Sequence, residues 1–152
     1  MEGTQMIDDP SKLPMIEDYK DDTEYKKVPK CIIFDDCIME DKRVLKVISK
    51  WYMCACKLGW TCFFLSQNYH STPTFIRRNL MYLFLFKLSD MSDAKKILSK
   101  CCVDIDLDTL KNMLTYATSE PLNFLTIAIN DPPNTRYRHN FDEILDPNQF
   151  KR

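Results

Sequence analysis

The sequence predicts an α/β fold built on a partial parallel sheet with flanking helices. Two short apolar runs, residues 31–34 and 61–65, have the composition of strands buried on both faces, as parallel strands are. Between them, residues 41–58 carry apolar side chains at helical spacing. A strand–helix–strand unit of this length requires parallel pairing and a right-handed crossover. The further alternation of strands and helices along the chain supports the same fold class.

The individual elements follow from local signals. The helix over 41–58 has one buried stripe opposite a row of lysines, and Gly59 stands where a C-cap glycine ends a helix. Pro73 precedes a short helix over 74–78. Later strands are expected over 80–86 and 123–129, and later helices over 92–101 and 107–117. The last seventeen residues, 136–152, are polar apart from a short apolar set, namely Phe141, Ile144 and Leu145.

Length and composition are those of one globular domain. The chain has 152 residues, of which 45% are hydrophobic and 28% charged, with a net charge of −1. We expect a flexible acidic lead-in over 1–29, a folded domain over 30–145 and a tail over 146–152. Because the net charge is near zero, any contact with nucleic acid needs local basic clusters, such as Lys26, Lys27 and Lys30, or Arg136, Arg138 and His139.

The seven cysteines and the lack of a signal peptide predict an intracellular, reduced chain. The pairs at 54/56 and 101/102 lack the C-x-x-C spacing of zinc knuckles, so buried structural thiols are favoured over a zinc site. The most apolar run, residues 80–88, is about half the length that spans a bilayer. No membrane partner is expected.

Polar side chains follow both strands of the predicted parallel pair. Asp35 and Asp36 end the first strand, and Ser66, Gln67 and Asn68 follow the second. Ligands of open parallel sheets bind beyond the carboxyl ends of the strands, so these groups should converge. Phosphoanhydride hydrolysis uses such a set: one carboxylate for Mg²⁺, a second that polarises water, and an amide near the γ-phosphate. The alternative is an Asp-Asp pair that only caps the turn into the next helix.

The phosphate-binding part of such a site is absent from the sequence. A P-loop of the form G-x-x-x-x-G-K-S/T needs two glycines five residues apart, and the chain has only Gly3 and Gly59. Arg77 lies after the Gln67 loop, where a guanidinium could reach the γ-phosphate of a neighbouring subunit. The alternative for Arg77 is an exposed arginine on a helical turn.

Four segments in this order resemble one known family: IIFDD (32–36), FFLSQNY (63–69), PxxIRxN (73–79) and YLFLFK (82–87). They are similar to the C-terminal half of viral DNA-packaging ATPases of the FtsK/HerA superfamily, found in poxviruses, virophages and Polinton-like elements. The segments YAT (116–118), FLTI (124–127) and YRxNF (137–141) are similar to the end of that domain. The resemblance covers about residues 30–145 and implies a P-loop NTPase, RecA-like sheet.

On this resemblance Asp35 matches the Walker B carboxylate for magnesium and Asp36 the catalytic carboxylate. Gln67 matches the sensor glutamine, Ser66 lies beside it in the cofactor site, and Arg77 matches a candidate arginine finger. The implied cofactors are ATP and Mg²⁺, and the implied partners are double-stranded DNA, a homo-oligomeric ring and capsid proteins, in the virion or viral factory. Because the P-loop half is missing, we expect this chain alone to bind no cofactor.

Two other functions remain open. The chain can be a non-catalytic remnant of viral or mobile-element origin that acts as an interaction module. It can also be a small nucleic-acid-binding domain that uses the basic residues near its end, Arg136, Arg138, Lys151 and Arg152. Affinity that falls steeply with salt would distinguish the last of these.

Overall fold

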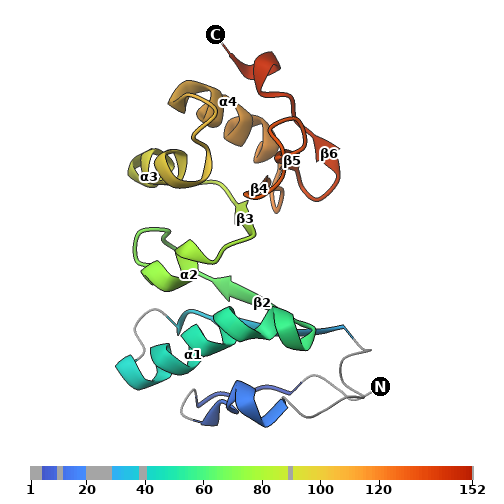
Figure 1. Ribbon diagram of the computed structural model, residues 1–152. Helices are drawn as coiled ribbons and strands as arrows, with labels where there is room; N and C mark the ends of the chain where they lie inside the picture. Colours follow the sequence, from blue (N-terminus) through green and yellow to red (C-terminus); the bar gives the residue numbers. More distant parts are fainter. Residues whose placement is uncertain (1–4, 10–11, 20–28, 38–40, 89–90, 152) are drawn as a thin grey trace. The chain divides into compact units, whose positions relative to one another are not determined.

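The computed structural model describes residues 5–9, 12–19, 29–37, 41–88 and 91–151 (Figure 1). The chain divides into two compact units. The first, here called the parallel unit, comprises Met1–Gln67 and Ser71–Asn79, and the second, the antiparallel unit, comprises Asn68–His70 and Leu80–Arg152. The architecture is α/β, as predicted, with one two-stranded and one four-stranded sheet among the described residues.

The sheet of the parallel unit consists of β1 (Lys30–Asp35) and β2 (Trp60–Leu65). The two strands pair in parallel with Asp35 opposite Leu65, which confirms the expected pairing. Helix α1 (Lys42–Cys54) and a 3-10 turn, η5 (Ala55–Leu58), connect them. Gly59 then adopts the left-handed conformation at φ 74°, so the predicted C-cap is confirmed.

Helix α1 covers one face of this strand pair. It begins after Asp41, whose carboxylate accepts hydrogen bonds from the backbone N–H groups of Arg43 and Val44. Its Tyr52 ring lies 6.2 Å from Phe34 of β1 and 6.5 Å from Phe64 of β2, measured between ring centroids. The alternate residues of both strands point to the other face, where Ile33 is 57% exposed and Leu65 47%.

The described part of the acidic lead-in differs from the flexible segment expected over 1–29. Residues Ile16–Tyr19 form a 3-10 turn, η2, with the Ile16 side chain buried. The indole N–H of Trp51 donates to the carbonyl of Pro14 at 2.9 Å, and Tyr19 packs against both tryptophan rings, Trp51 and Trp60. The buried Ile16 side chain, the Trp51–Pro14 hydrogen bond and the ring contacts of Tyr19 hold this segment in place.

The unit also contains α2 (Thr74–Arg78), which begins directly after Pro73 as predicted. Its Ile76 side chain is fully buried, and the helix contacts α1. Proline suits this position because it has no N–H to satisfy and its φ is fixed near the helical value.

The antiparallel unit contains β3 (Tyr82–Leu85), β4 (Leu125–Ala128), β5 (Tyr137–His139) and β6 (Glu143–Ile144), in that spatial order. All three pairings are antiparallel. The parallel sheet predicted from the sequence is therefore limited to β1 and β2 among the described residues, and a RecA-like sheet is not confirmed. Strands β3 and β4 are too short and apolar for their sequences to specify a partner, and tertiary contacts decide the pairing.

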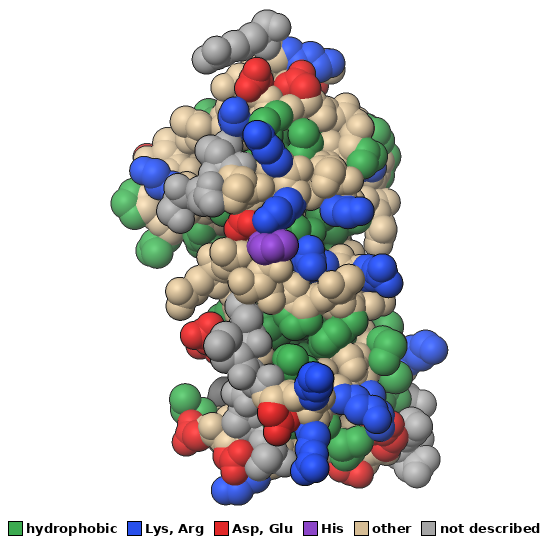
Figure 2. Space-filling view, turned by 90° about the vertical axis from the view of Figure 1, so that its left-hand side faces the viewer, with side chains coloured by type: hydrophobic (Ala, Val, Ile, Leu, Met, Phe, Trp, Pro, Cys, Tyr) green, Lys and Arg blue, Asp and Glu red, His purple; other side chains and the backbone are tan. Residues whose placement is uncertain are grey.

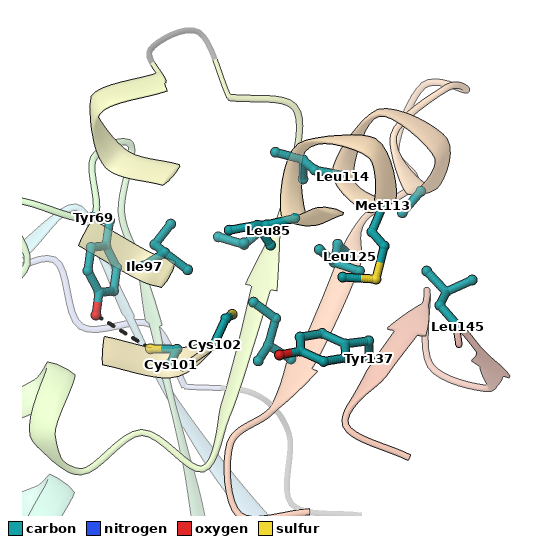
Figure 3. Close-up of a cluster of buried hydrophobic side chains, with 13 residues drawn as sticks. Tyr69, Leu85, Ile97, Cys101, Cys102, Met113, Leu114, Leu125, Tyr137 and Leu145 are labelled. Carbon is teal, nitrogen blue, oxygen red and sulfur yellow. Dashed lines mark hydrogen bonds between the residues drawn. The ribbon is translucent and has the colours of Figure 1, made fainter. Parts of the chain in front are cut away.

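Two helices and a final turn pack with this sheet: α3 (Met91–Cys101), α4 (Leu107–Ala117) and η6 (Pro147–Phe150). Figure 3 shows the core between them, in which side chains of α3 and α4 meet those of the strands. All four residues of β4 are buried, and Tyr137 of β5 is fully buried as well. Strands β5 and β6 lie in the segment 136–152 that the sequence reading left without strands.

Within the residues that the structure covers, no helix has the length and apolarity needed to cross a membrane. All seven cysteines are free thiols. Cys101 and Cys102 are buried, but Cys31 and Cys56 are exposed, so the expectation of buried thiols holds only in part.

Candidate functional site

The polar residues at the ends of β1 and β2 line one hollow of about 200 Å³ in the parallel unit. Its lining residues are Asp35, Asp36, Leu65, Ser66 and Gln67. The in-register parallel pairing explains this convergence, because it brings both carboxyl ends to the same sheet edge about 4.8 Å apart. Of the five polar residues expected to converge, four line the hollow: Asp35, Asp36, Ser66 and Gln67. Leu65 is an apolar wall that the sequence reading did not assign, although it is the last strand residue before Ser66.

Asp36 turns the chain away from the sheet. Its φ of 50° lies in the left-handed region, which aspartate tolerates better than most residues. The thiol of Cys37 donates to the carbonyl of Asp35 at 3.3 Å, within the same turn. The helix that follows is capped by Asp41 and not by the Asp-Asp pair. Asp41 thus supplies the N-cap of α1, and the carboxylates of Asp35 and Asp36 line the hollow.

A short chain of hydrogen bonds connects the hollow to α2. Thr72 donates through its hydroxyl to the hydroxyl of Ser66 at 3.2 Å. Arg77 donates from Nε to the carbonyl of Thr72 at 2.9 Å, and from Nη2 to the Thr74 hydroxyl at 3.2 Å. The guanidinium of Arg77 is thus held by its own chain. Thr72, which the sequence reading missed, links two of the predicted site residues.

Asn68, which was grouped with the polar strand end, belongs to the antiparallel unit. Its side-chain oxygen accepts from the backbone N–H of His70 at 2.7 Å. The next residue, Tyr69, is buried in the core of that unit, where its hydroxyl lies 3.6 Å from the sulfur of Cys101. Asn68 and Tyr69 therefore belong to the antiparallel unit. Of the residues that follow β2, Ser66 and Gln67 line the hollow.

Asp35 and Asp36 suit a magnesium ion that also takes ligands from the phosphates of a bound nucleotide. Oxygen donors are what Mg²⁺ prefers, and it is commonly held by one or two carboxylates together with substrate phosphates. Across the described ranges, no three His, Cys, Asp or Glu side chains gather where they could hold a metal ion by themselves. Asp35 and Asp36 can supply the protein part of such a site, and a triphosphate has to supply the rest.

Two of the seven thiols, those of Cys62 and Cys102, are unsuited to nucleophilic chemistry. Burial raises the pKa of the Cys62 thiol, and likewise that of Cys102, to about 12. Thiolates are the reactive species, so both thiols stay protonated and inert near neutral pH.

Of the basic residues near the end of the chain, Arg136 and Arg138 are paired with carboxylates, and Arg152 lies outside the described residues. Arg136 pairs with Asp104 at 2.7 Å, and Arg138 pairs with Asp131 at 2.6 Å. Tyr137, between them, also donates to Asp104 at 2.8 Å. On the face drawn in Figure 2, Lys and Arg side chains are mixed with Asp and Glu. These ion pairs argue against a nucleic-acid surface built on Arg136 and Arg138, since their charge is already compensated.

A comparison of this chain with protein-family models, with curated proteins and with solved structures finds no match.

Proposed function

We propose that this chain supplies the magnesium-binding and water-activating half of a nucleoside triphosphatase site, in a domain related to viral DNA-packaging ATPases. The observation that carries the proposal is the hollow at the ends of β1 and β2, where Asp35, Asp36 and Gln67 converge. Such grouping of two carboxylates and an amide beyond parallel strands suits phosphoryl transfer. The order of sequence motifs that resembles the packaging ATPases supports the same function.

Each residue has a distinct task in the proposed site. Asp35, the last residue of β1, would hold Mg²⁺ directly or through water. Asp36 would accept a proton from the attacking water, and its place in a tight turn keeps its carboxylate at the hollow. Ser66 and Gln67 would position the terminal phosphate by hydrogen bonds. The bound ion would neutralise charge that develops on the phosphates.

The phosphate cradle has to come from another segment or another chain, because the printed sequence contains no P-loop. In the complete assembly, hydrolysis would drive double-stranded DNA into a capsid through a ring of subunits. Arg77 acts as an arginine finger in that ring only if its guanidinium leaves Thr72 and Thr74. The proposal therefore rests on Asp35, Asp36, Ser66 and Gln67 and does not require Arg77.

The test joins this chain to a P-loop segment. If the coding sequence next to residue 1 encodes a strand followed by G-x-x-x-x-G-K-S/T, the joined protein should hydrolyse ATP. Asp36→Asn should then lower turnover by about a thousandfold or more while ATP affinity changes little, because only the water-activating charge is lost. Asp108→Asn, at an exposed carboxylate of the antiparallel unit, is the matched control and should be neutral. Full turnover of Asp36→Asn refutes the assignment.

A non-catalytic interaction module is the second candidate. It is favoured by the exposed apolar face of β1 and β2, where Ile33, Phe63 and Leu65 stand in solvent, and by the missing P-loop. A joined protein that binds ATP but hydrolyses none, with or without the Asp36 carboxylate, would favour this function.

A further inference from the structure

Helix α1 and the turn η5 that follows it carry positive charge only. Residues 42–58 include five basic side chains and no Asp or Glu, and the five are Lys42, Arg43, Lys46, Lys50 and Lys57. The two helices of the antiparallel unit mix both signs: α3 has Asp93 in its first turn, and in α4 Lys111 pairs with Asp108 at 3.5 Å. The whole chain has a net charge of −1, so this concentration of cations is local.

Four of these cations share one side of α1, here called the basic face: Lys42, Arg43, Lys46 and Lys50. Successive residues of an α-helix are turned by about 100°, which places the four within an arc of about 100°. The residues that α1 buries lie on the opposite side of the helix. Lys42, Arg43 and Lys46 are exposed, and Lys50 is half-buried. All four belong to the parallel unit, so the basic face is formed within one compact unit.

The basic face weakens the helix that carries it. Lys42 and Arg43 are the first two residues of α1, at the positive end of the helix dipole, and no acidic residue balances them in the first turn. Lys42, Lys46 and Lys50 then follow one another at a spacing of four residues, at which like charges repel. A loss of local stability with no gain for the fold is typical of a functional site. The charges therefore indicate an anionic ligand.

These charges are available to an anion. Among the described residues, Lys42, Lys46 and Lys57 form no ion pair. Lys50 contacts Glu17 at 3.3 Å, but the two side chains are 36% and 41% exposed, so solvent screens the pair and an anion can displace Glu17. In contrast, Arg136 and Arg138 each hold a carboxylate at 2.7 Å or less.

We propose that the basic face binds the phosphate backbone of double-stranded DNA. From Lys42 to Lys50 the helix extends about 12 Å, a length over which one DNA strand carries about four phosphates. Contacts to phosphates alone do not read base sequence, which suits a protein that moves along DNA. This inference rests on the proposed function only for the choice of DNA as the polyanion.

The rest of α1 argues against two other anionic partners. Single-stranded nucleic acid is bound by aromatic side chains that stack on its bases, but Trp51 is buried and Tyr52 packs against Phe34 and Phe64. A helix that binds a membrane surface inserts its apolar side into the lipid, whereas the apolar side of α1 is buried. A DNA duplex needs only the exposed cations.

Fluorescence anisotropy of a labelled duplex of about 20 base pairs measures binding by the whole chain, without nucleotide, between about 20 and 200 mM salt. Four phosphate contacts predict that log K falls with log salt at a slope of about −3 to −4. Lys42→Gln/Lys46→Gln removes two of these contacts. It should therefore reduce the steepness of the slope by about 2 and weaken binding at low salt at least about tenfold.

The matched control is Lys95→Gln/Lys100→Gln, which changes the net charge equally by removing two exposed lysines from α3. Its affinity should stay within about twofold of that of the wild type, because charges outside the contact act only through a screened field. Thermal unfolding followed by circular dichroism separates binding from folding. Since the lysines of the basic face repel each other, Lys42→Gln/Lys46→Gln should be at least as stable as the wild type. A less stable variant would show that these lysines serve the fold, and would overturn the proposal.

Three binding results also overturn it: a slope near zero, an equal loss of affinity in the two double variants, or tighter binding of a single strand or of phosphatidylserine vesicles than of the duplex. Asp36→Asn should bind the duplex as the wild type does, because Asp36 lies at the hollow and not on the basic face. Full turnover of Asp36→Asn, together with weak DNA binding by Lys42→Gln/Lys46→Gln, would refute the ATPase assignment and support the basic face.

Discussion

The two units of the chain differ in how completely they bury their sheets. In the antiparallel unit every residue of β4 is buried, and helices α3 and α4 contribute to a continuous core (Figure 3). In the parallel unit no residue of β2 is buried, and one face of the strand pair leaves Ile33 and Phe63 in solvent. Parallel strands are normally covered on both faces. The antiparallel unit has a complete core, and the parallel unit combines an open face with the candidate site.

This difference assigns stability and chemistry to different parts of the molecule. Residues that hold the antiparallel unit together are apolar and enclosed, and its described arginines, Arg136 and Arg138, are paired with carboxylates. Residues that line the hollow are accessible and, apart from Leu65, polar. Sites that bind ligands commonly come from the less stable parts of a protein, because they have to stay accessible. Substitutions can now test whether this division is real.

The largest effect is expected in the core of the antiparallel unit. Leu125 is fully buried, so Leu125→Ala should lower the free energy of unfolding by about 2–5 kcal/mol. Leu65→Ala removes a side chain that is half exposed at the hollow and should cost less than about 1 kcal/mol. Urea denaturation followed by circular dichroism measures both. Equal losses for the two leucines would contradict the contrast between the units.

The helix caps offer an intermediate, pH-dependent comparison. Backbone N–H groups of Val44 and Arg43 lower the pKa of Asp41 in the parallel unit, and those of Thr109 chiefly lower that of Asp106 in the antiparallel unit. Each folded pKa lies below the unfolded value of 3.8, so each cap stabilises its helix above about pH 4. That contribution is lost as the pH falls through the lowered pKa.

Asparagine is the matched substitution, since it caps a helix about as well as aspartate but does not titrate. In Asp41→Asn and in Asp106→Asn, the free energy of unfolding should fall less steeply below pH 4 than in the wild type. At pH 7 it should change little. Tryptophan fluorescence follows the parallel unit alone, because Trp51 and Trp60 both belong to it. If the two units unfold independently, only Asp41→Asn should change the pH dependence of the unfolding transition seen by fluorescence. An equal change in the Asp106→Asn variant would show that the units unfold together.

The smallest effect concerns the contact that holds β6. Glu143 accepts from Tyr116 at 3.0 Å, and one of its oxygens lies 2.6 Å from Nδ1 of His139. The hydrogen bond with His139, followed by that from Tyr116, lowers the pKa of Glu143 below its ordinary 4.5. The contact of Glu143 therefore stabilises the fold at pH values above its ordinary pKa. This stabilisation is lost as the pH falls through the lowered pKa of Glu143.

Replacing the two partners of Glu143 should rank their contributions. His139→Gln should return the pKa of Glu143 further toward 4.5 than Tyr116→Phe does, as followed by carboxyl carbon NMR. The reverse order would mean that α4, which carries Tyr116, holds β6 more firmly than β5 does.

Local signals in the sequence predicted most elements and their ends. Gly59, Pro73 and the buried stripe of α1 each determine a local conformation by their own chemistry, and each prediction is confirmed. The pairing of strands is harder to predict than these local conformations, because it depends on contacts between residues far apart in the chain. Nothing in the apolar run of β3 distinguishes a parallel partner from the antiparallel β4 that it has.

Two buried residues in polar segments were not predicted. Tyr137 is fully buried, yet its neighbours Arg136, Arg138 and His139 made the segment read as a polar tail. Ile16 stands beside Leu13 and Met15 in a segment that shows neither helical nor strand periodicity, so its burial was not predicted either. The candidate site was predictable because strand ends in register bring adjacent polar residues together without any long-range choice.

The left-handed backbone of Asp36 limits which residues evolution or an engineer can place there. At φ 50°, a residue with an ordinary Cβ pays a steric penalty of about 1–2 kcal/mol, whereas asparagine and glycine do not pay it in full. Alanine at this position would therefore disturb the turn along with the charge. A survey of natural variants should find Asp, Asn or Gly here and exclude valine and isoleucine. If Asp predominates where Gly and Asn would fold as well, then selection acts on the carboxylate and not on the turn.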